Sequence, residues 1–278
     1  MMTRFFFFLL FSFSLLAIDV KVASTPSVSP NGEDLVFSWR GDLWKVKTAG
    51  GQARQLTSHP ARDSWPYYSA DGKTIAFISN RNDIYHAFTV DSDGGVPKQW
   101  SAHSMGQTVL GWWPKSNKLI TRAWRDQKEF DRSRFFTLDK QGGEELLFDA
   151  YGYELSISND QKQALFTREM GKHYRKGERS DRTSQVWLYN FETKEYTSII
   201  HEKWGARSPM WKKHMSGFYY LGDERGSYNR YEYDFATKKA RQMTFFKDDS
   251  VMLPSLSADG STLVFRHLFA FYSIKTVE

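Results

Sequence analysis

Short segments in which apolar and polar residues alternate recur along the whole chain of 278 residues. They are rich in aromatic and β-branched side chains, which suit the pleated, half-buried surface of a strand. The segments are Asp42–Lys47, Ile84–Val90, Phe135–Leu138, Val186–Tyr189, Tyr231–Asp234 and Phe271–Ile274. Because no segment shows a sustained helical period, the pattern predicts an all-β protein.

A turn motif precedes each of these segments and gives the chain an internal repeat. It begins clearly at Ser29, Ser69 and Ser257, and in weaker form at Trp113, Ser158 and Trp211, so that successive copies lie 40 to 53 residues apart. The clear copies contain Asn-Gly or Asp-Gly, which supply the positive-φ residues that tight hairpins need. A period of this length indicates one supersecondary unit per repeat.

Each repeat holds four strand-like segments and therefore predicts a six-bladed β-propeller of four-stranded antiparallel blades over residues 24–278. A β-solenoid or an irregular sandwich is the alternative. The last copy reaches Glu278 before a fourth strand, so the last blade is expected to be incomplete. Either the segment Ile18–Ala23 completes that blade or the chain is a fragment of a longer protein. The abrupt stop favours the fragment.

The first residues have the layout of a secretory signal peptide. Arg4 gives a positive start, the apolar run Phe5–Leu16 follows, and Ala17 is a small residue at its end. The run is too short to span a bilayer well. We therefore expect a signal peptide over residues 1–17 and export to the periplasm or the extracellular space, with no other membrane segment. An uncleaved anchor or a buried strand is the alternative interpretation.

Composition narrows the chemistry that this chain can perform. The net charge is +6, but the basic residues are spread over many turns and form no nucleic-acid-binding module, so no nucleic-acid partner is expected. Cysteine is absent, which excludes disulfides, thiol catalysis and cysteine-based zinc sites. The seven histidines lack metal-ligand spacing, and no nucleophile elbow or phosphate loop occurs. We expect no catalytic residue, metal or cofactor on this chain.

Two basic segments stand out from this background. Arg168–Arg182 makes the fourth repeat the longest, and Arg122–Arg134 mixes arginine with aromatic residues. A charged run of this kind is typical of a solvated loop. The alternative is a basic rim that meets an acidic peptide end or a neighbouring domain, because arginine beside aromatic rings favours carboxylates and stacked groups.

An ordered set of motifs from about residue 24 to the end resembles the propeller repeats of the TolB and tricorn families. It resembles most closely the N-terminal six-bladed propeller of tricorn-like serine proteases. The motifs are Gly41–Val46, Arg54–Pro60, Ser69–Gly72, Val109–Trp112, Arg134–Leu138, Arg175–Gly177, Gln185–Asn190, Pro209–Trp211, Tyr220–Gly226 and Gln242–Thr244.

The resemblance implies an exported parent protein in which a second propeller, a small peptide-binding domain and a serine-protease core follow. These downstream domains and a peptide are the expected partners, and a homo-oligomer formed through the parent protein is left open. The resemblance also implies that the propeller acts as a channel or filter whose basic residues hold a substrate's C-terminal carboxylate. The nearest candidates are Arg132 and Arg134. Together with the loop residues Arg175, Lys176 and Arg179, they form the predicted peptide-binding set.

Three functions remain open at this point. The first is a non-catalytic propeller of a tricorn-like protease that gates peptides and scaffolds assembly. The second is a stand-alone periplasmic propeller that binds a partner protein or a cell-envelope component, as TolB does. The third is a propeller enzyme such as a sugar lyase or a lactonase, which would need clustered histidine or carboxylate side chains facing the channel.

Overall fold

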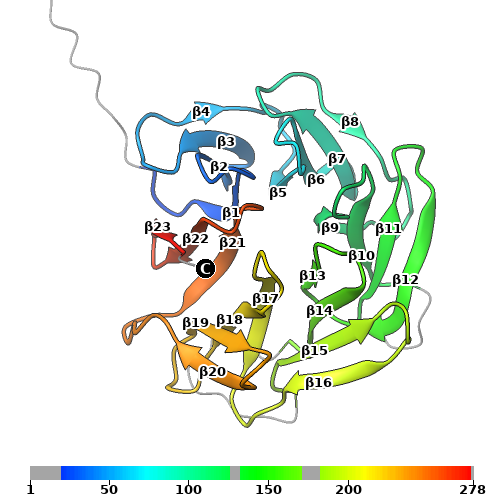
Figure 1. The fold of residues 1–278 in the computed structure, drawn as a ribbon. Coiled ribbons are helices and arrows are strands. Elements are labelled where there is room, and N and C mark those ends of the chain that lie inside the picture. The colour runs from blue at the N-terminus through cyan, green and yellow to red at the C-terminus, as the bar shows by residue number, and fades with distance from the viewer. Residues whose placement is uncertain (1–19, 126–131, 171–181, 277–278) are drawn as a thin grey trace, which may run out of the picture.

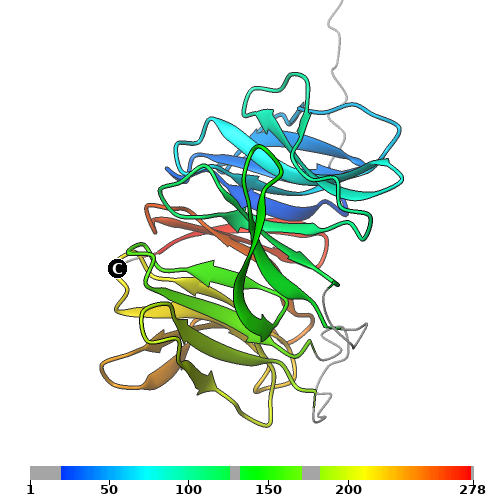
Figure 2. The same ribbon diagram turned by 90° about the vertical axis from the view of Figure 1, so that its right-hand side faces the viewer.

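The structure is a computed structural model that describes residues 20–125, 132–170 and 182–276. Within these ranges the chain forms 23 β-strands and no helix. Consecutive strands gather into six antiparallel sheets arranged around one axis, and the colour order of Figure 1 follows them once around the ring. Figure 2 shows the same ring from the side. The six-bladed, all-β fold predicted from the repeats is therefore confirmed.

Each of the first three blades takes four consecutive strands. Blade 1 consists of β1 (Ser24–Val28), β2 (Asp34–Trp39), β3 (Asp42–Lys47) and β4 (Arg54–Gln55). Blade 2 consists of β5 (Asp63–Tyr68), β6 (Thr74–Asn82), β7 (Ile84–Asp91) and β8 (Lys98–Gln99). Blade 3 consists of β9 (Thr108–Trp112), β10 (Leu119–Ala123), β11 (Arg134–Leu138) and β12 (Glu144–Tyr151).

The remaining blades follow the same order, except that the last has three strands among the described residues. Blade 4 consists of β13 (Leu155–Ile157), β14 (Gln163–Arg168), β15 (Gln185–Asn190) and β16 (Tyr196–Ile200). Blade 5 consists of β17 (Ala206–Trp211), β18 (Gly217–Gly222), β19 (Asn229–Asp234) and β20 (Lys239–Gln242). Blade 6 consists of β21 (Val251–Leu256), β22 (Thr262–His267) and β23 (Ala270–Lys275), which confirms the incomplete last blade.

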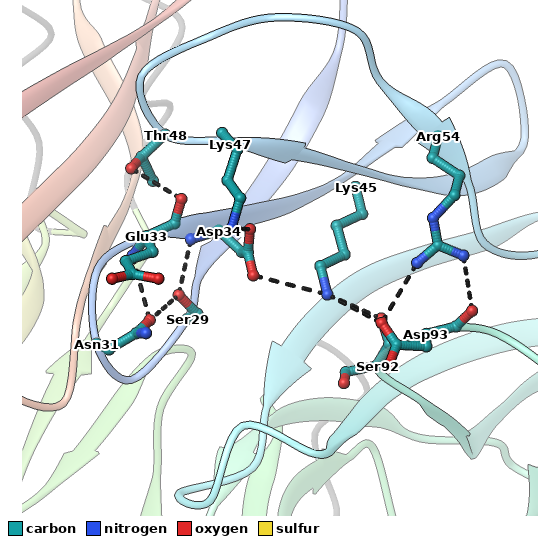
Figure 3. Close-up of polar contacts among 10 residues, drawn as sticks. All are labelled: Ser29, Asn31, Glu33, Asp34, Lys45, Lys47, Thr48, Arg54, Ser92 and Asp93. Carbon is teal, nitrogen blue, oxygen red and sulfur yellow. Dashed lines mark hydrogen bonds and ion pairs between the residues drawn. The ribbon is translucent and has the colours of Figure 1, made fainter.

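The repeated turn motif forms the hairpin between the first two strands of a blade. In blade 1 the Ser29 hydroxyl donates to Asn31 Oδ1 at 2.7 Å and accepts from the backbone N–H of Asp34 at 2.9 Å (Figure 3). Gly32 has a φ of 74°, which an L side chain rarely adopts. In three further hairpins the serine hydroxyl donates instead to a carboxylate oxygen, that of Asp71, Asp160 or Asp259. These carboxylates therefore serve the backbone, as the turn pattern predicts.

The hydrophobic core is divided among the junctions between blades. Each of the six buried clusters joins side chains of two neighbouring blades, including the pair formed by blade 6 and blade 1. At the junction of blades 1 and 2, for example, Val36 and Leu43 pack with Phe77 and Phe88. Burial of such side chains contributes about 2 kcal/mol each. Every blade is thus stabilised by its two neighbours.

Charged turns add polar contacts between blades at the outer edge of the ring. Lys45 of β3 donates to the carbonyl of Ser92 at 3.2 Å, and Arg54 of β4 donates to the carbonyl of Asp93 at 2.7 Å (Figure 3). Lys45 also lies 3.6 Å from the Asp34 carboxylate within its own blade. These contacts join blades 1 and 2 at the outer edge of the ring.

A β-bulge interrupts the innermost strand of several blades at one position. Thr25, Trp65, Ser208 and Leu253 all have φ near 50° and each precedes a proline. The pairing register of the four strands shifts at these residues. Proline lacks the N–H that a ladder would use and is therefore tolerated at a bulge. At two of the bulges the N–H of the residue before the proline donates to the preceding blade: that of Trp65 to the Thr25 hydroxyl at 3.4 Å, and that of Ser208 to Glu154 at 2.9 Å.

Candidate functional site

The innermost strands line a cavity of about 570 Å³ at the centre of the ring. Residues of blades 2 to 6 form its wall, and β5, β9, β13, β17 and β21 contribute most of them. Figure 1 shows these strands closest to the axis. Apolar side chains such as Leu110 and Met252 alternate in the wall with the charged side chains of Arg122, Glu154 and Arg207. We call this space the channel cavity.

Glu154 and Arg207 join blades 4 and 5 in the wall of the channel cavity. Arg207 Nε and Nη2 both donate to Glu154 Oε1, at 3.1 and 2.5 Å. The bulge at Ser208 turns its N–H toward Glu154 Oε2 at 2.9 Å, and its hydroxyl donates to Oε1 at 3.0 Å. Burial alone would raise the pKa of Glu154, but Arg207 and these hydrogen bonds lower it to about 2. The carboxylate is therefore ionised and fully engaged in holding two blades together.

Arg122 of β10 lies in the same wall without such a partner. Its guanidinium lies 5.0 Å from the ring of Trp124 and 5.6 Å from that of Tyr153. Among the residues that the structure describes, its buried Nε and Nη1 have no hydrogen-bond partner. Burial lowers the pKa of Arg122, and the negative charge of Glu154 acts in the opposite direction. Arginine stays protonated in proteins, so this side chain offers a positive charge and free donors that suit a carboxylate.

A second group of basic and aromatic side chains lies around Tyr151 at the end of β12. The guanidinium groups of Arg132 and Arg168 lie 4.2 and 4.6 Å from the Tyr151 ring. The Tyr151 hydroxyl donates to Glu169 at 2.6 Å. Met170, which follows Glu169, reaches the wall of the channel cavity. The two basic segments predicted from the sequence therefore meet at this group, beside the channel cavity.

The predicted peptide-binding residues are only partly brought together. Arg132 belongs to the group around Tyr151, whereas Arg134 lies on β11 and pairs with Asp149 at 2.5 Å. Neither residue lines the channel cavity. Arg175, Lys176 and Arg179 lie outside the described residues. Peptide binding by these five residues stays a prediction.

Two histidines outside the channel wall have local structural contacts. His59 Nδ1 accepts the backbone N–H of Ala61 at 3.0 Å, so this side chain serves the local backbone between β4 and β5. His86 is buried in β7 beside Ser101. In the described part of the chain, no three histidine or carboxylate side chains come close enough to hold a metal ion. The same residues contain no helix long and apolar enough to cross a membrane.

Five of the described charged residues line the channel cavity, namely Arg122, Glu154, Arg207, Lys213 and Arg266, and sequence reasoning singled out only Arg122. Arg122 is the first residue of the predicted basic segment Arg122–Arg134. Glu154 and Arg207 were not predicted, because they are 53 residues apart and meet only when blades 4 and 5 pack. The one available signal is Pro209, which occupies the bulge position that Pro26, Pro66 and Pro254 mark in other repeats.

Comparison with known proteins agrees with this architecture. Residues 21–277 match the family described as the tricorn protease N-terminal beta propeller domain. Tricorn protease homolog 1 of Streptomyces coelicolor is 21% identical over 172 residues, which make up 61% of this chain and 16% of that protein. The crystal structure of the tricorn protease superposes with a TM-score of 0.77 at 18% identity, over 92% of this chain and 25% of that one.

Propellers of another family share the fold at similar identity. The putative TolB of Agrobacterium tumefaciens superposes with a TM-score of 0.70 at 16% identity, over 93% of this chain and 91% of that one. This chain thus spans a minor part of the tricorn relatives and nearly all of the TolB structure. Because the family match covers almost its whole length, the chain belongs to the family of tricorn protease N-terminal β-propeller domains.

Proposed function

We propose that this propeller is a non-catalytic, peptide-binding domain of an exported tricorn-like serine protease, and that Arg122 holds a peptide carboxylate in the channel cavity. The observation that carries the proposal is the pair of buried guanidinium nitrogens without a partner among the described residues. Burying unpaired donors is costly, and a bound carboxylate would remove that cost. Arg122 is not among the five peptide-binding residues predicted from the sequence, and the proposal adds it to them as a residue that binds the peptide carboxylate.

The dimensions and chemistry of the channel cavity support a peptide ligand. Its volume of about 570 Å³ lies within the range typical of small-ligand sites. The rings of Trp124 and Tyr153 flank the guanidinium, and Leu110, Met170 and Met252 supply apolar wall. An arginine with an apolar surround fits a peptide end that presents a carboxylate beside an apolar side chain.

The parent protein follows from the same proposal. This chain covers 16% of the length of the Streptomyces coelicolor relative and 25% of the tricorn protease structure. We therefore propose that peptidase chemistry belongs to other domains of the parent chain, which are its partners, and that this propeller gates peptides and scaffolds their assembly. Export would be directed by the signal-like segment of residues 1–17.

The test measures binding of a fluorescein-labelled peptide, Gly-Ser-Ala-Leu-Phe, by fluorescence anisotropy. The peptide is used with a free C-terminal carboxylate and as its C-terminal amide. We expect amidation to weaken binding about tenfold, because a charge-assisted hydrogen bond contributes about 1.5–3 kcal/mol. Arg122→Gln should weaken binding of the carboxylate form equally, and amidation should then have no further effect.

Arg241→Gln is the matched control, because Arg241 is exposed on β20 and pairs with Glu232 away from the channel cavity. It should leave binding unchanged. Arg132→Gln separates the two candidate surfaces. If Arg132→Gln weakens binding while Arg122→Gln does not, the ligand binds at the group around Tyr151 and the channel assignment is wrong. Binding that ignores amidation in every variant would also contradict the proposal.

A further inference from the structure

Arg122 and Arg266 occupy the same position of the second strand, one in blade 3 and the other in blade 6. The carbonyls of Lys118 and Thr262 close the preceding hairpins with equivalent backbone hydrogen bonds. Arg122 on β10 and Arg266 on β22 each lie four residues further along the chain. The repeat therefore orients the two arginines alike within their blades.

The equivalent residues of other blades point toward the innermost strands. In blade 4 the position holds Thr167, whose hydroxyl accepts the N–H of Ser208 at the bulge of β17, at 3.1 Å. In blade 1 it holds Ser38, whose hydroxyl is hydrogen-bonded to that of Thr25 at the bulge of β1, at 2.7 Å. A longer side chain at this position reaches the axis of the ring, and both arginines line the channel cavity.

Blades 3 and 6 face each other across the channel cavity. Two blades separate them in either direction around the ring, and Figure 1 shows β10 and β22 on opposite sides of the axis. Because both arginines line one cavity of about 570 Å³, their charges belong to opposite walls of it. A single carboxylate bound at one wall leaves the other guanidinium without a counter-charge, whereas a ligand with two carboxylates can bridge the cavity.

The wall of the channel cavity carries an excess of positive charge. Its described residues include four cationic side chains and one carboxylate, Glu154, which Arg207 already neutralises. Arg266 is half-buried, and within the described chain its side chain makes no hydrogen bond or ion pair. Charge of one sign on the walls of a cleft concentrates the electric field and attracts ligands of the opposite charge.

We propose that the channel cavity selects acidic peptides, in which the C-terminal carboxylate binds Arg122 and the side-chain carboxylate of an aspartate or glutamate binds Arg266. This inference rests on the proposed function for the first carboxylate and adds the second. A guanidinium suits the role because it binds a carboxylate through two parallel N–H groups. Met252, which pairs with Arg266 across β21 and β22, supplies apolar wall beside the second carboxylate.

The test measures peptide affinity by isothermal titration calorimetry with unlabelled, N-acetylated peptides. Each of the first four residues of Gly-Ser-Ala-Leu-Phe is replaced in turn by glutamate or by its neutral isostere, glutamine. At one favoured spacing from the C-terminus, glutamate should bind about fivefold more tightly than glutamine, because a charge-assisted hydrogen bond is stronger than a neutral one. Each step along an extended peptide moves the second carboxylate by about 3.4 Å, so at other spacings the two peptides should bind alike.

Three variants of the full chain assign the preference to a residue. Arg266→Gln should abolish the preference for glutamate, while amidation of the C-terminus, which reports on Arg122, should still weaken binding. Arg266→Glu should reverse the preference, so that a lysine peptide of the favoured spacing binds more tightly than the glutamate peptide, and this gain also shows that the variant is folded. Lys213→Gln is the matched control, because it removes an equal charge from the same wall and should keep the preference at the favoured spacing.

The outcomes separate this inference from the proposed function. Equal affinity of glutamate and glutamine peptides at every spacing, with the amidation effect present, would overturn this inference alone. A preference at all spacings that Arg266→Gln and Lys213→Gln reduce alike would assign it to the overall charge of the wall and overturn the role of Arg266. If none of the peptides binds, both proposals are wrong. A preference at one spacing that Arg266→Gln alone removes and Arg266→Glu reverses would support the inference.

Discussion

Arg207 and Arg122 lie in the wall of the same cavity, but only Arg207 is paired with a carboxylate. Arg207 contacts Glu154 through two nitrogens, and Ser208 fixes the other carboxylate oxygen. Arg122 contacts the rings of Trp124 and Tyr153, and no carboxylate of the described residues lies within ion-pair distance of it. The difference separates an arginine that joins two blades from one whose donors remain available to a ligand.

Removing the charge of Glu154 is expected to change the stability of the chain more than any other substitution considered for these two arginines. Glu154→Gln leaves Arg207 buried without its counter-charge, which should lower the free energy of unfolding by about 3 kcal/mol at neutral pH. Urea unfolding measures the loss. Glu145→Gln is the control, because Glu145 pairs with Lys118 on the exposed outer surface and should cost less than about 1 kcal/mol. Equal losses in the two variants would contradict a special role for the buried pair.

Low pH should remove the stabilisation by the Glu154–Arg207 ion pair in the wild-type chain. The pKa of Glu154 is lowered from 4.5 to about 2, so its ion pair stabilises the fold fully above pH 4.5 and is lost as the pH falls toward 2. The difference in the free energy of unfolding between wild type and Glu154→Gln should therefore narrow steadily across that window. A difference that stays constant over the window would mean that Glu154 is not ionised in the folded chain.

Replacing Arg122 should have the smallest effect on stability. Arg122→Met removes a buried charge with unpaired donors and keeps apolar contact with Trp124 and Tyr153, so the free energy of unfolding should change by less than about 1 kcal/mol. Thermal and urea unfolding both report this change. A loss of more than about 2 kcal/mol would place Arg122 with Arg207 among residues that hold the ring together, and the contrast between them would disappear.

The ring could be predicted from the sequence because its repeated signal is local. Ser29, Asn31 and Asp34 make their hydrogen bonds within five residues, and the serine and its acceptor recur in four of the six hairpins. Even the weaker copy in blade 4 keeps Ser158 and Asp160, although Gln161 replaces glycine at a φ of 65°. Local chemistry therefore revealed six hairpins, and six hairpins revealed six blades.

The channel wall could not be predicted in the same way, because its contacts join different repeats. Glu154 meets Arg207 only through the packing of β13 against β17, and the bulge at Ser208 orients the hydrogen bonds. The residues around Arg122 in the sequence do not predict that its Nε and Nη1 are buried without a hydrogen-bond partner among the described residues. The recurring prolines mark where the inner strands bulge, but they do not reveal which side chains meet there.

Every blade in the described residues is built from one continuous stretch of chain, so no strand is shared between blades 6 and 1. Their contacts include side-chain packing, such as Phe37 against Phe271, a hydrogen bond from Val28 N–H to the Ser255 hydroxyl at 3.0 Å, and one from Asp259 N–H to the Pro30 carbonyl at 3.1 Å. Gain or loss of one whole repeat would therefore leave every sheet intact and change only the circumference. In such a ring, gene duplication can widen the central passage in steps of one blade.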